Sequence, residues 1–189
     1  IKQRLVGSAV WLLPYGKGRQ FGSGASRGME FLFGGWEFSP IITLQQGLGL
    51  TPTQDGLLNL GGERSSRPNR LGNGTLSADQ QTVDRFFDTS AFQVLSPTAG
   101  AAGFVPNQAF GNSGVGVVRG PNLINVDFNL SKNFDISERQ SIQFRTEFFN
   151  AFNRANCGVP GVRIGAGFGQ IVNTITESRI IQFALKYRF

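Results

Sequence analysis

The twelve residues at the end of the chain, 178–189, constrain its fold more than any other stretch. They read Ser-Arg-Ile-Ile-Gln-Phe-Ala-Leu-Lys-Tyr-Arg-Phe. One row of side chains, at every second position, consists of Ile181, Phe183, Leu185, Tyr187 and Phe189. A period of two residues predicts a β-strand. A half-buried strand of a soluble protein shows the same alternation, so the pattern alone leaves open whether this row contacts a protein core or lipid.

The length and the ending of this segment favour lipid. At about 3.3 Å per residue it can cross a tilted hydrocarbon layer, which takes roughly 9 to 11 residues per strand. Tyr187 and Phe189 then lie where an aromatic girdle belongs. A final Phe preceded by alternating apolar residues also resembles the closing strand of bacterial outer-membrane barrels, which the barrel assembly machinery recognises. This resemblance implies that Tyr187 and Phe189 form an assembly signal.

Length, composition and charge limit the fold classes and functions that this chain can have. A chain of 189 residues suits one domain. No stretch approaches the roughly 18 consecutive apolar residues of a membrane helix, so any membrane crossing must use strands. The formal charge of +6 is scattered along the chain without a basic run, which argues against nucleic-acid binding. The chain starts Ile-Lys-Gln, with neither an initiator Met nor a signal segment, so we expect a mature product or a piece of a longer protein.

The reactive residues argue against an enzyme. The chain has no His, which excludes mechanisms that depend on imidazole. Its single cysteine, Cys157, cannot form an internal disulfide. Asp79, Asp84 and Asp88 are closely spaced, but acidic residues at such spacing usually solvate a loop, and they do not fit a calcium-loop pattern. We therefore expect no catalytic residue, no metal site and no cofactor.

Four further segments predict strands. They cover about residues 3–13, 36–47, 122–134 and 140–152. Pro40 lies inside the second of them and removes one ladder hydrogen bond, which predicts a bulge or an unpaired position there. The Gly-rich connection before that strand lacks the features of a phosphate-binding loop, and Met29–Phe33 within it predicts a short interfacial turn.

The strand over 122–134 has one row of wholly polar side chains. A large barrel turns such a row toward a hydrated lumen. By the same alternation we expect six residues of three strands to face the lumen: Asp127, Asn129, Arg145, Glu147, Lys186 and Arg188. Their charges are expected to form cross-strand pairs, with solvated charges that have no specific partner as the alternative. Phe128, Phe148, Phe183 and Leu185 are expected to contact lipid.

Lys132 is the exception, because it falls in the apolar row. A lysine on the lipid face costs roughly 2 to 4 kcal/mol at the bilayer midplane but about 0 to 1 kcal/mol near the interface. Lys132 lies close to the end of its strand. We expect its long stem to carry the ammonium group into the headgroups.

The connections between the predicted strands differ in length. The strands at 122–134 and 140–152 are joined by a short turn and predict an antiparallel hairpin. The stretches 48–120 and 153–177 are long and aperiodic, which is unusual in a compact soluble domain but typical of the outer loops of membrane barrels. The sequence therefore predicts an all-β chain: an antiparallel transmembrane β-barrel segment of about five strands, an incomplete barrel, with long extracellular loops.

Six segments in the right order resemble one family across essentially the whole chain. The chain is similar to the C-terminal part of a TonB-dependent outer-membrane receptor, of the Oar-like kind that carries an N-terminal carboxypeptidase-regulatory-like domain. The segments are Leu13–Gly18, Gly34–Trp36, Phe86–Phe92, Arg119–Pro121 followed by Asp127 and Lys132, Arg145–Asn153, and Phe168–Ile171 continued by Arg179–Phe189.

The resemblance implies active uptake of a large or scarce nutrient, such as a metal chelate or an oligosaccharide, across the outer membrane of a Gram-negative bacterium. TonB would drive it through an N-terminal part, and the plug domain is absent from these residues. Five strands cannot close a barrel, since the smallest membrane barrels have about eight. We therefore expect either a fragment of a receptor of about 22 strands or a homo-oligomer of chains that complete one another. The competing hypothesis is a structural or adhesive extracellular subunit that assembles edge to edge, because unpaired strand edges template pairing.

Overall fold

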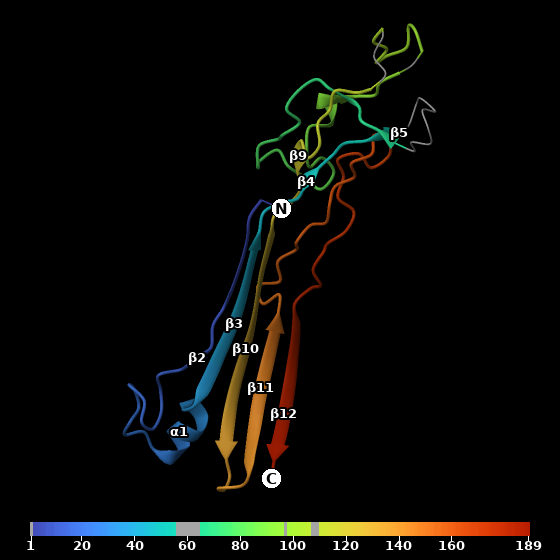
Figure 1. The fold of residues 1–189 in the computed structure, drawn as a ribbon. Helices are drawn as coiled ribbons and strands as arrows, with labels where there is room; N and C mark the ends of the chain where they lie inside the picture. Colours follow the sequence, from blue (N-terminus) through green and yellow to red (C-terminus); the bar gives the residue numbers. More distant parts are fainter. Residues whose placement is uncertain (1, 56–64, 97, 107–109) are drawn as a thin grey trace. The chain divides into compact units, whose positions relative to one another are not determined.

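The computed structural model describes residues 2–55, 65–96, 98–106 and 110–189 (Figure 1). They form two compact units. The strand unit consists of residues 4–45, 124–155 and 176–189. The loop unit consists of residues 46–123 and 156–175 with the first residues of the chain. Within the described ranges, no helix is long and apolar enough to cross a membrane.

The strand unit is an antiparallel sheet with five strand positions. Its order is β1, β3, β10, β11, β12, and β2 pairs with β3 next to β1. The strands are β1 (Arg4–Ser8), β2 (Trp11–Leu12), β3 (Trp36–Gln45), β10 (Leu123–Asp135), β11 (Ser141–Phe149) and β12 (Ile180–Arg188). The outer strands β1 and β12 do not pair with each other, so the sheet is not closed. The predicted fold class, an all-β antiparallel segment of an incomplete barrel, is confirmed.

Pro40 explains why the first strand position is split into β1 and β2. The register pairs Ser8 with Ile41 on one side of Pro40 and Trp11 with Phe38 on the other. The two pairings keep the same spacing, so no extra residue is inserted and there is no bulge. The backbone N–H of Ala9 donates to the carbonyl oxygen of Pro40 at 3.3 Å, but proline has no N–H to return the bond. Of the two predicted outcomes, the unpaired position is the one observed.

β10 and β11 form the predicted hairpin. Their register runs from Phe128 opposite Phe148 to Asp135 opposite Ser141. The turn over residues 136–140 is closed by the backbone N–H groups of Ile136 and Ser137, which both donate to the carbonyl oxygen of Gln140, at 2.9 and 3.1 Å. This short turn lies at the end of the sheet where β12 also ends (Figure 1).

The connection between β2 and β3 contains the helix α1 (Arg27–Phe33) at the same end of the sheet (Figure 1). The Ser26 hydroxyl caps the helix by accepting from the backbone N–H of Met29 at 3.4 Å. The helix ends where Gly34 turns extended and Gly35 adopts a φ of 70°. The expected short turn at 29–33 is thus a two-turn helix that begins two residues earlier.

The loop unit contains small two-residue ladders. β4 (Gly49–Leu50) pairs with β9 (Val118–Arg119), β5 (Gln54–Asp55) with β6 (Ser65–Ser66), and β7 (Asn69–Arg70) with β8 (Phe92–Gln93). The 3₁₀ helix η1 (Thr89–Ala91) directly precedes β8. The stretches that the sequence presents as aperiodic therefore have local structure of their own.

A hydrophobic core joins the two long loops within the loop unit. Its buried members are Leu50, Phe87, Ala91, Phe92 and Val118. Phe168, from the second loop, meets the rings of Phe87 and Phe92 edge to face, at centroid distances of 5.1 and 6.1 Å. Backbone bonds support this contact, since the N–H of Phe86 donates to the carbonyl oxygen of Gly169 at 2.9 Å. The two loops thus fold as one body.

Candidate functional site

The strand register places the six candidate lumen residues on one face of the sheet. Asn129 is opposite Glu147, and Arg145 is opposite Ser131. Lys186 and Arg188 are opposite Gln143 and Ser141 of β11. Directly opposed residues point the same way, and successive residues alternate, so Asp127 shares this face with Asn129. We call it the polar face. That it lines a barrel lumen stays a prediction.

The opposite face, here called the apolar face, carries rows of aromatic rings. Phe128 stacks on Phe148 at a centroid distance of 4.4 Å and lies 5.3 Å from Phe38. Phe144 and Phe183 stack at 6.3 Å. Tyr187 is opposite Ile142, and its ring stacks on Phe189 at 5.7 Å. The role of Tyr187 and Phe189 in assembly stays a prediction.

The ionic contacts of the polar face run along a strand. Among the described residues, the ion pair within the sheet joins Arg145 Nε and Glu147 Oε1 of the same strand at 3.3 Å. The prediction of cross-strand pairs is therefore wrong for these residues. The reason is the register: Arg145 faces Ser131 and Ala184, while Glu147 faces Asn129 and Gln182. No acid of this set is directly opposite a base.

Asp127 is occupied by hydrogen bonds at the open end of the hairpin, opposite the turn over residues 136–140. Its Oδ1 accepts from Asn125 Nδ2 at 2.9 Å and from the backbone N–H of Asn150 at 2.8 Å. Asn150 is buried and has a φ of 46°, a left-handed conformation that asparagine tolerates well. Its Nδ2 donates to the carbonyl oxygens of Arg154 and Glu177, at 3.0 and 2.9 Å. Asn150 thus ties the end of β11 to the residues that lead into β12.

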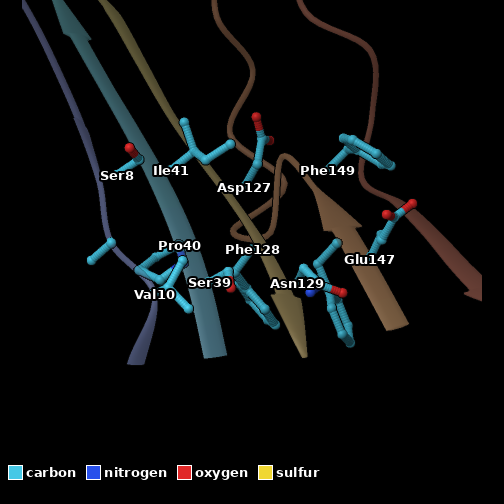
Figure 2. A pocket seen from close by; sticks show the side chains of 12 residues that line it. Ser8, Val10, Ser39, Pro40, Ile41, Asp127, Phe128, Asn129, Glu147 and Phe149 are labelled. Atoms are coloured by element: carbon cyan, nitrogen blue, oxygen red, sulfur yellow. The ribbon is translucent and has the colours of Figure 1, made fainter. Parts of the chain in front are cut away.

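A hollow of about 410 Å³ opens across β1, β3, β10 and β11. Its hydrogen-bonding groups come from Ser8, Ser39, Asp127, Asn129 and Glu147, and its apolar lining includes Val10, Ile41 and Phe149. Figure 2 shows the carboxylates of Asp127 and Glu147 on the neighbouring strands β10 and β11. The hollow contains three of the six candidate lumen residues.

The exposed lining of the hollow is mostly apolar, and several of its polar groups are engaged within the protein. The Oδ1 atom of Asn129 is buried and has no hydrogen-bond partner. Asp127 Oδ1 already accepts two hydrogen bonds, and Glu147 Oε1 is paired with Arg145. In the part of the chain that the structure describes, no group of three His, Cys, Asp or Glu side chains could hold a metal ion. The hollow therefore offers a solute mainly apolar contact.

Lys132 has hydrogen-bond partners in the protein that the sequence analysis did not anticipate. Its side chain is 4% exposed and reaches the C-terminal end of α1; that the ammonium group lies at the level of the headgroups stays a prediction. Its ammonium group donates to the carbonyl oxygen of Glu30 at 3.1 Å and also to that of Gly34. It lies 5.6 Å from the centroid of Trp36 and 5.2 Å from that of Phe134. A lysine side chain can donate hydrogen bonds to the last carbonyl groups of a helix. The sequence predicts only a short turn at this place, so the helix that provides these carbonyl groups was missed.

The acidic cluster of the loop unit has structural contacts. The hydroxyl of Ser90 and the guanidinium of Arg85 hold the pKa of Asp88 below its usual range. Asp88 Oδ1 accepts from Ser90 Oγ at 2.7 Å and from Arg85 at 2.8 Å, at the start of η1. A hydrogen bond from Ser77 lowers the pKa of Asp79. Carboxyl groups with lowered pKa values remain ionised and are poor proton donors.

Comparison with known protein families gives a match over most of the chain. A family model described as an outer membrane beta barrel domain matches residues 1–182. The comparisons with curated proteins and with solved structures find no match.

Proposed function

This chain belongs to the outer membrane beta barrel domain family and acts in the bacterial outer membrane, and from this premise we propose that it supplies the last barrel strands of a TonB-dependent receptor. The cargo would be a large or scarce nutrient, such as a metal chelate or an oligosaccharide. Uptake would be energised by the TonB complex, which would act through an N-terminal part and a plug domain. The proposal needs no catalytic residue and no cofactor.

The observation that carries the proposal is the polar face. On β10 the side chains Asn125, Asp127, Asn129, Ser131 and Asn133 alternate with an apolar row. In a bilayer such a row must meet water, and a barrel wide enough for a hydrated lumen provides it. The sheet has five strand positions and open edges at β1 and β12. Open edges are costly in lipid, so additional strands must pair with them.

The segment Arg145–Asn153 adds support from the resemblance. It is the most recognisable element that the chain shares with TonB-dependent receptors of the Oar-like kind. Its residues form the ion pair of the polar face, one wall of the hollow, and the turn at Asn150 that leads toward β12. The long loops 48–120 and 153–177 would lie outside the cell, since barrels keep their short turns in the periplasm. The loop unit would then form part of the outer surface that meets the cargo.

Uptake by whole cells tests the proposal. A strain lacking the complete gene would be offered radiolabelled ferric chelates and oligosaccharides in parallel with its parent. We expect loss of uptake for one class, and an equal loss in a parent treated with a protonophore or lacking TonB, while cargo still binds to the cell surface. Uptake that ignores the protonophore would instead indicate a passive pore. Unchanged uptake with weakened cohesion between cells would favour the structural or adhesive subunit.

A further inference from the structure

We propose that α1 and the connection around it, residues 14–35, form a membrane-interface element that binds anionic phospholipid in the periplasmic leaflet of the outer membrane. We call these residues the α1 segment. The inference requires only that the chain is an outer-membrane barrel domain, and it is independent of TonB and of any cargo. Three observations carry it: an inverted burial pattern, continuity with the apolar face, and positive charge.

The burial pattern of α1 is the reverse of that of a helix in water. Its four large hydrophobic side chains, Met29, Phe31, Leu32 and Phe33, are 44 to 60% exposed. Glu30, the only acidic residue of the segment, is instead half-buried, and its carboxylate accepts from the backbone N–H of Lys17 at 2.8 Å. A helix at the surface of a soluble protein turns apolar side chains inward and charged ones outward. This pattern fits a helix whose exposed side contacts lipid.

Three contacts hold α1 on the apolar face of the sheet. The ring of Phe31 lies 4.9 Å from that of Phe134. The indole N–H of Trp36 donates to the carbonyl oxygen of Leu32 at 2.9 Å. The ammonium group of Lys132 binds the end of the helix. Phe134, Trp36 and Lys132 all belong to the rows that contain Phe128 and Phe38. In an outer-membrane barrel the outward apolar face contacts lipid, so the exposed side of α1 continues that surface.

The position of α1 along the sheet indicates which leaflet of the membrane the helix contacts. The helix lies at the end that carries the short turn over residues 136–140 (Figure 1). Short turns of outer-membrane barrels are periplasmic, and aromatic girdles mark both interfaces. Trp36, Phe134 and Tyr187 lie near this end of their strands. The α1 segment is thus level with the headgroups of the periplasmic leaflet.

The charges of the segment match anionic headgroups. Lys17, Arg19 and Arg27 are exposed, and among the described residues none of them is in an ion pair. With Glu30 as the only acid, three positive charges and one negative charge leave the segment with a net charge of +2. Basic side chains beside an exposed apolar helix are typical of elements that lie in the plane of a bilayer interface.

Spin labels in the complete protein test the inference. The protein would be reconstituted in vesicles of phosphatidylethanolamine and phosphatidylglycerol, with Cys157→Ser as background. A nitroxide at Leu32→Cys reports on the helix, and one at Glu138→Cys, in the short turn, serves as the water-exposed control. We expect oxygen to relax the Leu32 label several-fold more effectively, relative to a water-soluble nickel complex, than it relaxes the control. A label at Leu185→Cys on β12 verifies that the barrel is inserted.

The anionic requirement is tested by lipid exchange. Replacing phosphatidylglycerol with phosphatidylcholine should move the Leu32 label toward water. The triple variant Lys17→Gln, Arg19→Gln, Arg27→Gln should abolish this difference between the two lipid mixtures. Equal access of the nickel complex to the labels at residues 32 and 138 would overturn the inference. Protection of the Leu32 label from both reagents would also overturn it, because protein rather than lipid would then cover the helix, and an insensitivity to lipid charge would refute the anionic part.

Discussion

Replacing Lys132 with Met tests whether its ammonium group is only tolerated on the apolar face or anchors α1 there. If the ammonium group is merely tolerated near the interface, its removal is neutral or stabilising, since a lysine there costs about 0 to 1 kcal/mol. The structure instead predicts that the substitution lowers the stability of α1. A hydrogen bond from a charged donor contributes about 1.5 to 3 kcal/mol. Two such bonds are removed, to the carbonyl oxygens of Glu30 and Gly34.

The net effect of Lys132→Met is smaller than the sum of these bonds. The carbonyl oxygen of Glu30 keeps the bond from the N–H of Gly34, at 2.9 Å. Removing a charge from a buried site also recovers part of its desolvation cost. We therefore expect α1 to be destabilised by about 1 to 2 kcal/mol, equivalent to roughly a 5- to 30-fold rise in its opening equilibrium. The barrel as a whole should keep its stability, because methionine is flexible and apolar and can pack against the rings of Trp36 and Phe134.

Hydrogen exchange of the reconstituted complete protein measures this effect. Peptides that cover residues 27–35 should exchange faster in the Lys132→Met variant, whereas peptides from β11 should not change. Lys186→Met is the matched control: it makes the same substitution on the polar face, opposite Gln143, at a position far from α1 in the strand order. Unchanged exchange over 27–35 in the Lys132→Met variant would refute the anchoring role. Equal acceleration by Lys186→Met would show that the effect is not specific to the helix.

Three further predictions concern facing, assembly and pH. Spin labels at Phe148 and Phe183 should be relaxed by oxygen and labels at Glu147 and Lys186 by a water-soluble reagent; equal water access at both sets would contradict the assigned faces. Phe189 is 93% exposed, so Phe189→Ala should leave the melting of the inserted protein unchanged but lower the amount that reaches the outer membrane, measured by surface labelling; normal abundance would speak against an assembly signal. Because the pKa of Asp88 is lowered on folding, its contribution to the loop unit is present above the usual Asp pKa of about 3.9 and is lost as the pH falls through the folded value. Hydrogen exchange around η1 should therefore accelerate in acid, and the Asp88→Asn variant should remove this acid-dependent step.

The strands were predictable because each carries its own signal. The alternation places β3, β10, β11 and β12 to within about three residues, and the segment predicted at 3–13 covers both β1 and β2. The hairpin of β10 and β11 follows from their short separation. The alternation of polar and apolar residues along a strand depends only on neighbouring positions, so it can be recognised in a single sequence.

The structure of the long loops was not predictable, because their core is assembled from single residues far apart in the chain. Phe87, Phe92 and Phe168 come together from two loops, and neither loop has a period. The ionic contacts of the polar face depend on register, which alternation leaves open. The partner of Lys132 was missed for a related reason: its bonds reach about 100 residues back along the chain, to carbonyl oxygens that every residue type provides.

Asn150 is the part of the candidate site whose importance is easiest to test by substitution. The side chain donates to the carbonyl oxygens of Arg154 and Glu177 and accepts from the backbone N–H of Arg154 at 2.9 Å. A neighbouring bond, from the N–H of Arg179 to Asn153 Oδ1 at 3.0 Å, holds the same crossing to β12. Asn150→Ala removes three hydrogen bonds of about 0.5 to 1.5 kcal/mol each and places alanine in a left-handed conformation that costs roughly 1 to 2 kcal/mol.

Comparing alanine with glycine at this position separates the loss of the hydrogen bonds from the strain of the left-handed backbone. Asn150→Gly removes the same bonds but tolerates the φ of 46°. We therefore expect unfolding in urea to become easier by about 2.5 to 6.5 kcal/mol for Asn150→Ala and by about 1 to 2 kcal/mol less for Asn150→Gly. Hydrogen exchange at the start of β12 should rise in both variants, because both release the carbonyl oxygen of Glu177. If both variants unfold like the parent, the turn at Asn150 does not hold β12 in place. If both lose stability equally, the backbone conformation carries no strain, and the side-chain bonds alone account for the asparagine.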